Sequence, residues 1–285
     1  MNIVAGTPHT HKILVLGANG RLGRMVRAVW SNPRFQEIEV IPVSRLGDVD
    51  GRGFAWNPGD DSGVFPQVDV VLALWGVIRG DPPVLKQNVV LAEKAIEVAE
   101  KTGAQTLLHA SSVAVYAFGD DALSEESELD PVSPYGQSKL EMERIVLNHP
   151  TQVRQVLMRI GNVAGTQSLF DNLAKGQSIT LDRFSDGTGP VRSFIAPHDL
   201  AASVLALAGD NSVSGPVNIA APGVTAMADL VTAAGCQLEW RDAPTNAIKH
   251  VEMDTRLLQS VCRFPDESSQ ADYLLQSARA TGVWP

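Results

Sequence analysis

Strand and helix patterns alternate regularly along the first 160 residues, and few folds accommodate such an alternation. Short apolar runs rich in β-branched residues indicate buried strands, and apolar residues three and four apart indicate helices. The predicted strands cover 12–16, 37–43, 54–56, 68–75, 106–110 and 152–160, and the predicted helices cover 22–31, 81–103 and 134–147. Alternation on this scale requires a parallel sheet with helices on both faces and right-handed crossovers. We therefore expect an α/β fold with a doubly wound parallel sheet.

Beyond residue 161 the pattern is looser, although three further elements can be predicted. Residues 199–208 have a helical pattern, with Asp199 as the predicted N-cap. Residues 217–220 form a predicted strand and residues 226–234 a predicted helix. The sequence contains no visible internal repeat, and no flexible linker separates this part from the first.

The charge balance excludes several classes of partner. The chain of 285 residues has 23 basic and 32 acidic residues, a formal charge of −9, and no cluster of Lys or Arg. Such a chain is not expected to bind nucleic acid or an anionic membrane surface. The longest apolar run, Val70–Ile78, is far shorter than the roughly 20 residues of a spanning helix. Residues 1–11 lack the pattern of a signal peptide and are expected to be a short tail.

The two cysteines, Cys236 and Cys262, indicate neither a disulfide framework nor a metal site. No metal-ligand spacing of His, Cys and carboxylates is present either, so no metal is expected. We expect a cytoplasmic protein.

A glycine-rich loop follows the first predicted strand and begins the first predicted helix. It reads Gly17-Ala-Asn-Gly20-Arg-Leu-Gly23. Glycines at this place let a pyrophosphate approach backbone N–H groups at a helix N-terminus without hindrance from a Cβ atom. The alternative is a tight strand-to-helix turn with no ligand. The strand–turn–helix context favours a dinucleotide site, and its predicted residues in this loop are Gly17, Asn19, Gly20, Arg21, Leu22 and Gly23.

This loop suggests a division of the chain. Residues 12–165 are the predicted Rossmann-type dinucleotide-binding domain, after a tail of residues 1–11. Residues 166–285 are the predicted substrate-binding region, of which about 190–220 is expected to pack back on the first domain.

The end of the second strand bears on the choice of cofactor. An acid there favours the free 2′-OH of NAD, whereas an arginine accommodates the 2′-phosphate of NADP. The chain reads Ser44-Arg45, with no acid before Asp48, and Arg21 could add a second positive charge. We predict NADP, with NAD as the alternative, because Arg45 could equally be a solvated turn residue. Ligands bind at the carboxyl ends of parallel strands, so Leu74, Trp75 and Gly76 are also assigned to the cofactor site.

A tyrosine and a lysine four residues apart open the predicted helix 134–147. The spacing places Tyr135 and Lys139 on one helical face, one turn apart. A nearby ammonium favours the phenolate, so we expect a lowered Tyr135 pKa and proton exchange with a substrate oxygen. Ser111 and Ser112 follow the strand 106–110, where one hydroxyl could bind the same oxygen. The alternatives are an exposed lysine beside a half-buried tyrosine and serines that merely cap a turn.

Together these motifs resemble the extended short-chain dehydrogenases/reductases, of the NAD-dependent epimerase/dehydratase type. The resemblance runs in order from Lys12 to about Ala220. The segments that carry it are Gly17–Gly23, Asn88-Val-Val, Ser111-Ser112-Val-Ala-Val-Tyr116, Pro134-Tyr-Gly-Gln-Ser-Lys139, Arg159-Ile-Gly-Asn162-Val-Ala-Gly165, Arg192-Ser-Phe-Ile and His198-Asp199-Leu200.

The resemblance implies a role for each matching residue. Tyr135 is then the general acid/base, and Lys139 binds the nicotinamide ribose and lowers the Tyr135 pKa. Ser112 orients the reacting oxygen, and Asn88 supports a water-linked proton path. The predicted substrate-binding residues are Ser112, Asn162 and Arg192. A homodimer through the tyrosine-bearing helix and its neighbour is likewise expected only from the resemblance.

Two departures from the family limit the substrate prediction. First, Ala117-Phe118-Gly119 replaces the usual glycine after Val-Tyr. Second, the C-terminal part is short for an enzyme that encloses a nucleotide-sugar, and Arg192 is its candidate residue for binding the diphosphate. The leading hypothesis is an NAD(P)-dependent oxidoreductase that transfers hydride to or from a carbonyl or alcohol carbon of a small, sugar-like substrate. The alternatives are a nucleotide-sugar epimerase/dehydratase and a non-catalytic NADP-sensing protein.

Overall fold

The computed structural model describes residues 11–285 except 36, 48–52, 120 and 177. The predicted tail 1–11 lies outside these residues apart from His11, which already belongs to the first strand. Asp48, which bears on the cofactor choice, is also outside them.

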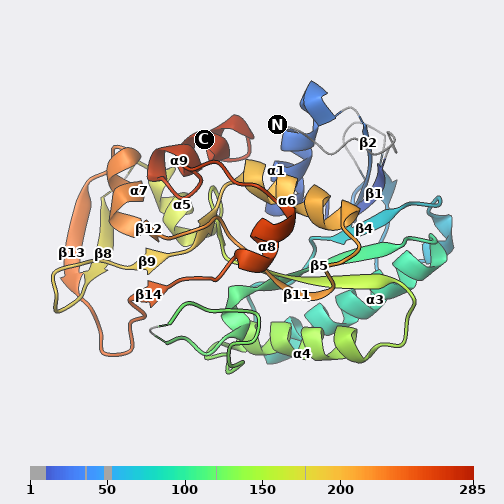
Figure 1. Ribbon diagram of the computed structural model, residues 1–285, viewed down its shortest axis with the longest axis horizontal. Helices are drawn as coiled ribbons and strands as arrows, with labels where there is room; N and C mark the ends of the chain where they lie inside the picture. Colours follow the sequence, from blue (N-terminus) through green and yellow to red (C-terminus); the bar gives the residue numbers. More distant parts are fainter. Residues whose placement is uncertain (1–10, 36, 48–52, 120, 177) are drawn as a thin grey trace.

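A seven-stranded parallel sheet forms the centre of the molecule (Figure 1). Its strands follow the order β11-β6-β5-β4-β1-β2-β3, and every pairing is parallel. The strands are β1 (His11–Leu16), β2 (Ile38–Ser44), β3 (Phe54–Ala55), β4 (Val70–Ala73), β5 (Thr106–Ser112), β6 (Arg154–Ile160) and β11 (Gly215–Ile219). The predicted doubly wound α/β fold is confirmed.

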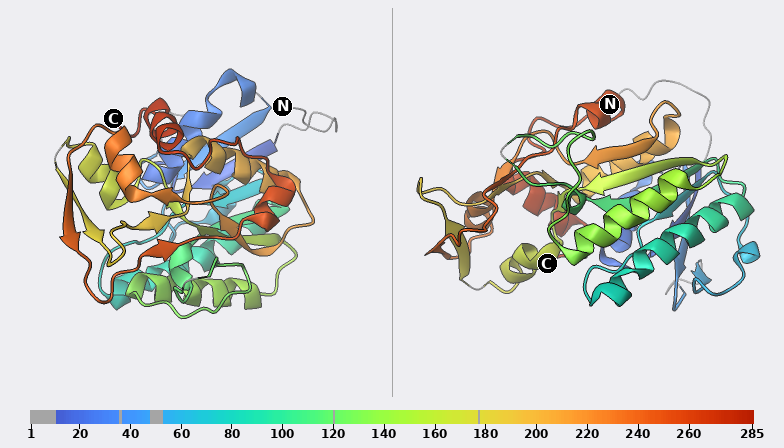
Figure 2. Two further views of the ribbon diagram at one scale, coloured as in Figure 1. Left: turned by 60° about the vertical axis from the view of Figure 1, so that its left-hand side comes forward. Right: turned by 90° about the horizontal axis from the view of Figure 1, so that it is seen from below.

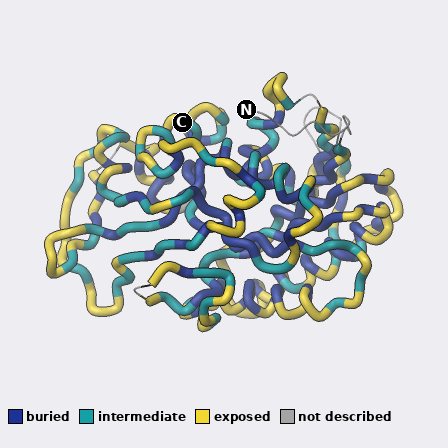
Figure 3. Tube along the Cα trace, viewed as in Figure 1, coloured by how far each residue is buried: buried dark blue, intermediate teal, exposed yellow. Residues whose placement is uncertain are grey.

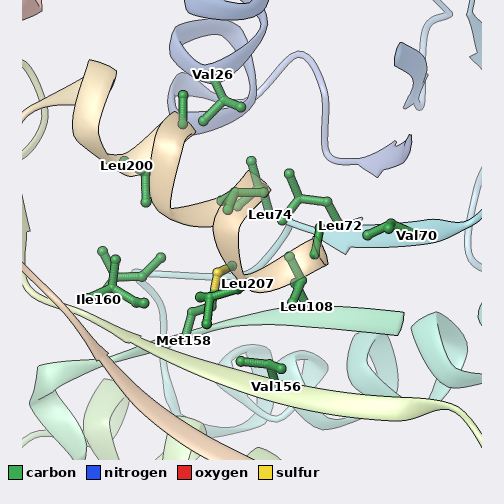
Figure 4. Packing of buried hydrophobic residues seen from close by; sticks show 14 of the residues in the cluster. Val26, Val70, Leu72, Leu74, Leu108, Val156, Met158, Ile160, Leu200 and Leu207 are labelled. Carbon is green, nitrogen blue, oxygen red and sulfur yellow. The ribbon is translucent and has the colours of Figure 1, made fainter. Parts of the chain in front are cut away.

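Helices cover both faces of the sheet because successive strand residues point to opposite sides. Helices α1 (Arg21–Trp30) and α6 (Pro197–Gly209) pack on one face, where Val26, Leu200 and Leu207 meet Leu72 and Met158 (Figure 4). Helices α3 (Gln87–Lys101) and α4 (Pro134–Asn148) pack on the other, after the short α2 (Pro82–Leu85) (Figure 2, right). The buried segments concentrate in these strands and on the inner sides of these helices (Figure 3).

A smaller cluster of elements lies beside the carboxyl ends of β6 and β11 (Figure 1, left). Its helices are α5 (Gln167–Leu173), α7 (Met227–Ala233) and α9 (Ala271–Ala280), whereas α8 (Arg256–Val261) packs against α6 and β11, with Leu258 in the main core. Its strands form three small sheets, β10 (Phe194–Ile195) with β7 (Asn162–Val163), β12 (Thr225–Ala226) with β9 (Val191–Arg192) and β14 (His250–Val251), and β13 (Leu238–Asp242) with β8 (Ile179–Arg183). Phe170, Leu230, Leu274 and Trp284 are buried in a separate apolar core here.

One predicted helix start is wrong. Asp199 is not an N-cap, since α6 begins at Pro197 after Ala196. Proline is well suited to the first helical position, so the start moves two residues earlier. Asp199 is instead buried in the first turn and accepts a hydrogen bond of 2.8 Å from the Tyr273 hydroxyl.

Two general features bear on function. Within the described residues, no helix combines the length and apolar character that crossing a membrane requires. In the same part of the chain, no group of three or more His, Cys, Asp or Glu side chains is arranged to hold a metal ion.

Candidate active site

The glycine loop connects β1 to α1 and leaves no room for side chains at two of its glycines. Gly17 has φ +85°, and a Cβ atom there would lie 2.7 Å from the backbone nitrogen of Trp75. A Cβ atom on Gly23 would lie 2.5 Å from the Gly17 carbonyl oxygen. Contacts this short do not occur, so the loop can adopt this tight path only with glycine at both positions.

The N-terminus of α1 fits an anion such as a dinucleotide pyrophosphate. Its N-cap, Gly20, offers no side chain to the first backbone N–H groups, and the first turn contains no acid. Uncapped N–H groups and the positive end of the helix dipole both favour a bound phosphate. Leu22 is half-buried against the core, whereas the Arg21 guanidinium forms an exposed ion pair of 2.6 Å with Asp171 on α5.

The predicted cofactor residues after β2 divide into two groups. The Asn19 side-chain amide donates to the Ser44 hydroxyl (2.8 Å) and to the Gly47 carbonyl (2.9 Å), and Ser44 donates to the same carbonyl (2.7 Å). These bonds tie the glycine loop to the turn that follows β2. The Arg45 side chain is exposed and has no hydrogen-bond or ion-pair partner among the described residues.

The segment after β4 brings the cofactor and catalytic candidates together. Leu74 is buried in the core, and the Trp75 ring stacks on Trp56 with 6.0 Å between ring centroids. A Cβ atom on Gly76 would lie 3.1 Å from Asn88 Oδ1 and 3.3 Å from Lys139 Nζ. The backbone at Gly76 therefore passes directly over both side chains.

Asn88 joins this segment to α4. Its Oδ1 accepts from the Val77 N–H (2.9 Å), and its Nδ2 donates to the Val77 carbonyl (2.9 Å) and to the Ser138 hydroxyl (3.0 Å). Asn88 also lines a small cavity of about 10 Å³, together with Lys139, His109 and other residues. This volume is about that of one water molecule.

Ser112 is the last residue of β5, and Tyr135 and Lys139 lie in the first turns of α4 (Figure 1). The Ser112 hydroxyl lies close enough to the Tyr135 phenol to lower its pKa, and it accepts from the Ala114 N–H at 3.2 Å. Lys139 is buried, and its Nζ donates to the Ala110 carbonyl at 2.8 Å. The start of α4 is fixed by its N-cap Ser133, since its hydroxyl accepts from the Gly136 N–H at 3.0 Å.

The expected lowering of the Tyr135 pKa is wrong for this structure. Burial raises the pKa of the Tyr135 phenol, and the hydrogen bond from Ser112 lowers it only in part. The reason is that the Lys139 ammonium is directed at the Ala110 carbonyl. Burial also lowers the pKa of Lys139 to about 8, partly offset by the negative charge of Glu143. The phenol is therefore protonated at neutral pH.

The other two predicted substrate-binding residues, Asn162 and Arg192, donate hydrogen bonds to backbone carbonyls. The Asn162 amide donates to the Ser193 carbonyl at 3.3 Å. The Arg192 guanidinium donates to three carbonyls, those of Val191 (2.7 Å), Lys249 (2.9 Å) and Ile248 (2.6 Å). Arg192 therefore holds β9 against the segment before β14 and is not a free cation in this conformation.

A buried polar cluster next to the candidate catalytic residues was not predicted. Glu143 and Arg159 form an ion pair of 2.8 Å and are 1% and 2% exposed, and Ser111 donates to Glu143 at 2.5 Å. One signal could have found Glu143, because it continues the spacing of four from Tyr135 and Lys139. His109 on β5 is also buried, and burial lowers its pKa to about 4.

Comparison with known proteins bears on the family and on the fold. Residues 13–220 match the model of the NAD dependent epimerase/dehydratase family. No curated protein sequence matches the chain.

Solved structures resemble the chain over nearly its whole length at low sequence identity. A short-chain dehydrogenase/reductase superfamily protein from Agrobacterium tumefaciens with bound NAD is 20% identical, with a TM-score of 0.77 over 95% of this chain and 97% of that one. A UDP-glucuronic acid 4-epimerase from Bacillus cereus in complex with NAD is 18% identical, with a TM-score of 0.73 over 94% and 98%. A UDP-N-acetylglucosamine 4-epimerase from Methanobrevibacter ruminantium is 17% identical, with a TM-score of 0.76 over 94% and 97%. At these identities the likeness establishes the fold alone.

Proposed function

The chain belongs to the NAD-dependent epimerase/dehydratase family, and from that premise we propose that it is an enzyme that transfers hydride between a bound nicotinamide dinucleotide and a carbonyl or alcohol carbon of a small substrate. The observation that carries the proposal is the placement of Ser112, at the end of β5, near the Tyr135 phenol, whose pKa it lowers, with the buried Lys139 one turn further along α4. These groups lie at the same sheet edge as the glycine loop, because a Cβ atom on Gly76 would lie 3.3 Å from Lys139 Nζ and one on Gly17 would lie 2.7 Å from the nitrogen of the neighbouring Trp75.

Each residue of this group has a distinct role in the proposed reaction. A bound nicotinamide supplies the hydride donor or acceptor. As the substrate carbonyl becomes an alcohol, Tyr135 gives its phenolic proton to the substrate oxygen, and Ser112 holds that oxygen with a second hydrogen bond. The positive charge of Lys139 stabilises the phenolate left behind. Because burial keeps the phenol protonated, the site as described is ready to protonate a carbonyl, which is the reductive direction.

The cofactor would be held by the residues around the glycine loop. The first turn of α1 binds the pyrophosphate, and Arg45, exposed at the end of β2, binds a 2′-phosphate. We therefore propose NADP as the preferred dinucleotide, with NAD, the cofactor named for several structural neighbours, as the alternative.

An epimerase or dehydratase acting on a nucleotide-sugar is the second candidate, because the structural neighbours include UDP-sugar epimerases and an NDP-hexosamine dehydratase. Two observations disfavour this second candidate, the first its nucleotide-sugar substrate and the second the dehydratase reaction. Arg192 donates to three backbone carbonyls and so is not free to bind a diphosphate. Residues Val113–Val115, directly after Ser112, contain no acid that could protonate a departing hydroxyl. A non-catalytic NADP sensor is disfavoured, because it would need no Ser112–Tyr135–Lys139 group.

Self-association is a further part of the proposal. The helix that carries Tyr135 and its neighbour α3 both expose apolar residues, with Val90 on α3 56% and Leu147 on α4 55% accessible. Contiguous patches of exposed apolar side chains are typical of contact surfaces. We expect a homodimer through these two helices.

The cofactor assignment predicts a selective loss of affinity. Replacing Arg45 by alanine is expected to weaken NADPH binding about tenfold or more, because a charge-assisted contact to the 2′-phosphate is lost. NADH affinity should stay unchanged. Fluorescence titration of both proteins with both dinucleotides measures this. Equal NADPH affinity of the two proteins, or a tighter fit to NADH in the original chain, would show that Arg45 is not a phosphate reader.

The same preparations then distinguish the reaction classes. The tighter-binding dinucleotide, in its reduced form with aldehydes and ketones and in its oxidised form with UDP-sugars, is incubated with the protein, and both absorbance at 340 nm and products are followed. A reductase consumes one reduced cofactor per product, whereas an epimerase or dehydratase forms product with no net change of cofactor. Binding of dinucleotide without either reaction would favour the sensor.

A further inference from the structure

A second connection between α4 and β5 lies next to the candidate catalytic group. Glu143 is one helical turn beyond Lys139, which is itself one turn beyond Tyr135. The Glu143 carboxylate is 1% exposed and accepts a hydrogen bond of 2.5 Å from the Ser111 hydroxyl. Ser111 directly precedes Ser112, so Glu143 holds the strand end that presents Ser112 to Tyr135.

Arg159 completes this connection from the neighbouring strand. In the β5–β6 pairing it stands opposite Ser111, and its side chain is 2% exposed. Its Nε donates to both Glu143 oxygens (3.1 and 3.2 Å), and its Nη2 donates to Oε2 (2.8 Å). Ser111, Glu143 and Arg159 thus link β5, α4 and β6 at one point.

The cluster also extends away from α4. Arg159 Nη1 donates to the Tyr116 hydroxyl (3.0 Å), which donates to Asn218 Oδ1 on β11 (2.7 Å). The Asn218 amide then donates to the carbonyls of Leu123 (2.7 Å) and Asp254 (3.0 Å). The segment before α4 and the end of β11 are therefore attached to the same ion pair.

Stability alone does not explain this ion pair. Removing two charges from water is expensive, and well-packed apolar residues of similar volume are often as stabilising or more so. The pair does, however, act on the site, since the Glu143 charge opposes the effect of burial on the pKa of Lys139.

We propose that Glu143 and Arg159 are positioning residues for the reaction: through Ser111 they fix the end of β5 so that Ser112 meets Tyr135, and Glu143 places a negative charge one turn from the Lys139 ammonium. The expected effect on the reaction rests on the proposed function. The expected effect on the placement of Ser112 beside Tyr135 does not.

The test replaces the pair by apolar residues, Glu143→Leu with Arg159→Met. The double variant is expected to fold and to bind NADPH within about threefold of the original affinity. Its kcat should fall about tenfold or more, because the Ser112–Tyr135 contact is lost. The pKa of Tyr135, measured without substrate by tyrosine absorbance near 295 nm, should rise, because the hydrogen bond from Ser112 lowers it. Subtracting the titration of the same variant carrying Tyr135→Phe isolates this phenol.

Glu143→Gln provides a second variant that retains the packing if the double variant does not fold. Its amide oxygen can still accept from Ser111, but the charge is lost, so the pKa of Lys139 should fall further below about 8. The high-pH decline of kcat should then move to lower pH by about half a unit or more.

Arg154→Met is the matched control. Arg154 lies at the other end of β6, where it donates to Thr106, Leu207 and Val213. Its loss should reduce stability and leave kcat, the pH profile and the Tyr135 titration unchanged.

The outcomes distinguish a failure of the positioning role from a failure of the proposed function. A folded double variant with unchanged kcat and unchanged Tyr135 titration would overturn the positioning role. If the original protein catalyses no hydride transfer, the proposed function fails, and the Tyr135 titration alone still decides whether the pair positions Ser112.

Discussion

Replacing Tyr135 by phenylalanine is expected to lower turnover by about 10²–10⁴-fold, because the proton donor to the substrate oxygen is lost. The ring remains and the glycine loop is untouched, so dinucleotide affinity should change by no more than about threefold. The measurement is kcat for the first substrate found in the carbonyl panel, together with an NADPH titration.

Tyr273→Phe is the matched control for this substitution. It removes the same hydroxyl from a tyrosine that donates to Asp199 on α6, in a different hydrogen-bond group. This variant should lose some stability and retain its turnover. Full activity in Tyr135→Phe, or an equal loss in both variants, would mean that Tyr135 is not the acid/base.

Replacing Lys139 by methionine is expected to abolish turnover and yet stabilise the protein at neutral pH. Burial lowers the pKa of Lys139 from 10.5 to about 8. At 1.36 kcal/mol per unit, the buried ammonium destabilises the folded state by about 3 kcal/mol. The substitution removes this destabilisation but also the hydrogen bond to Ala110, which contributes about 1 kcal/mol, so the free energy of unfolding should increase by about 2 kcal/mol.

The sign of this effect fixes its pH dependence. Below pH 8 lysine is protonated in both the folded and the unfolded chain, so the penalty is fully present. Between pH 8 and 10.5 the folded chain holds fewer protons than the unfolded one, and the stability of the original protein rises with pH. The difference between the two proteins should therefore shrink across this window in urea unfolding experiments.

An exposed lysine serves as the control for these experiments. Lys86, after α2, is exposed, and Lys86→Met should alter stability little at any pH. A Lys139→Met protein that is less stable than the original at pH 7 would contradict the argument.

Much of the fold could be predicted from sequence, because its signals are local. Apolar runs located the strands of the sheet, and even the weak strand at 54–56 is present as β3, Phe54–Ala55. Ser112 lies at the carboxyl end of β5, where ligands of parallel sheets bind, and Tyr135 lies in the first turn of α4, the next α-helix along the chain, so the predicted order of elements already placed both near one edge of the sheet.

The features that could not be predicted depend on tertiary contacts. The pKa of Tyr135 follows from its burial and from the direction of the Lys139 ammonium, and neither is encoded in their spacing. The spacing of four places Glu143 on the helical face of Tyr135 and Lys139, but a glutamate on a helix is usually solvated, so the spacing does not show that Glu143 is buried against Arg159. The carbonyls that hold Arg192 lie more than 50 positions away along the chain, apart from that of Val191.

The most direct test of the account is the ionisation of Tyr135 with and without bound dinucleotide. The chain has three tyrosines, and burial raises the pKa of Tyr116 to about 12 and also raises that of Tyr273. The positive charge of an oxidised nicotinamide next to Tyr135 would favour its phenolate. We predict that saturating NADP⁺ lowers the pKa of one tyrosine, measured by absorbance near 295 nm, and that Tyr135→Phe abolishes this change. A titration that NADP⁺ and NAD⁺ both leave unaltered, or a shift that persists in Tyr135→Phe, would contradict a nicotinamide site at Tyr135.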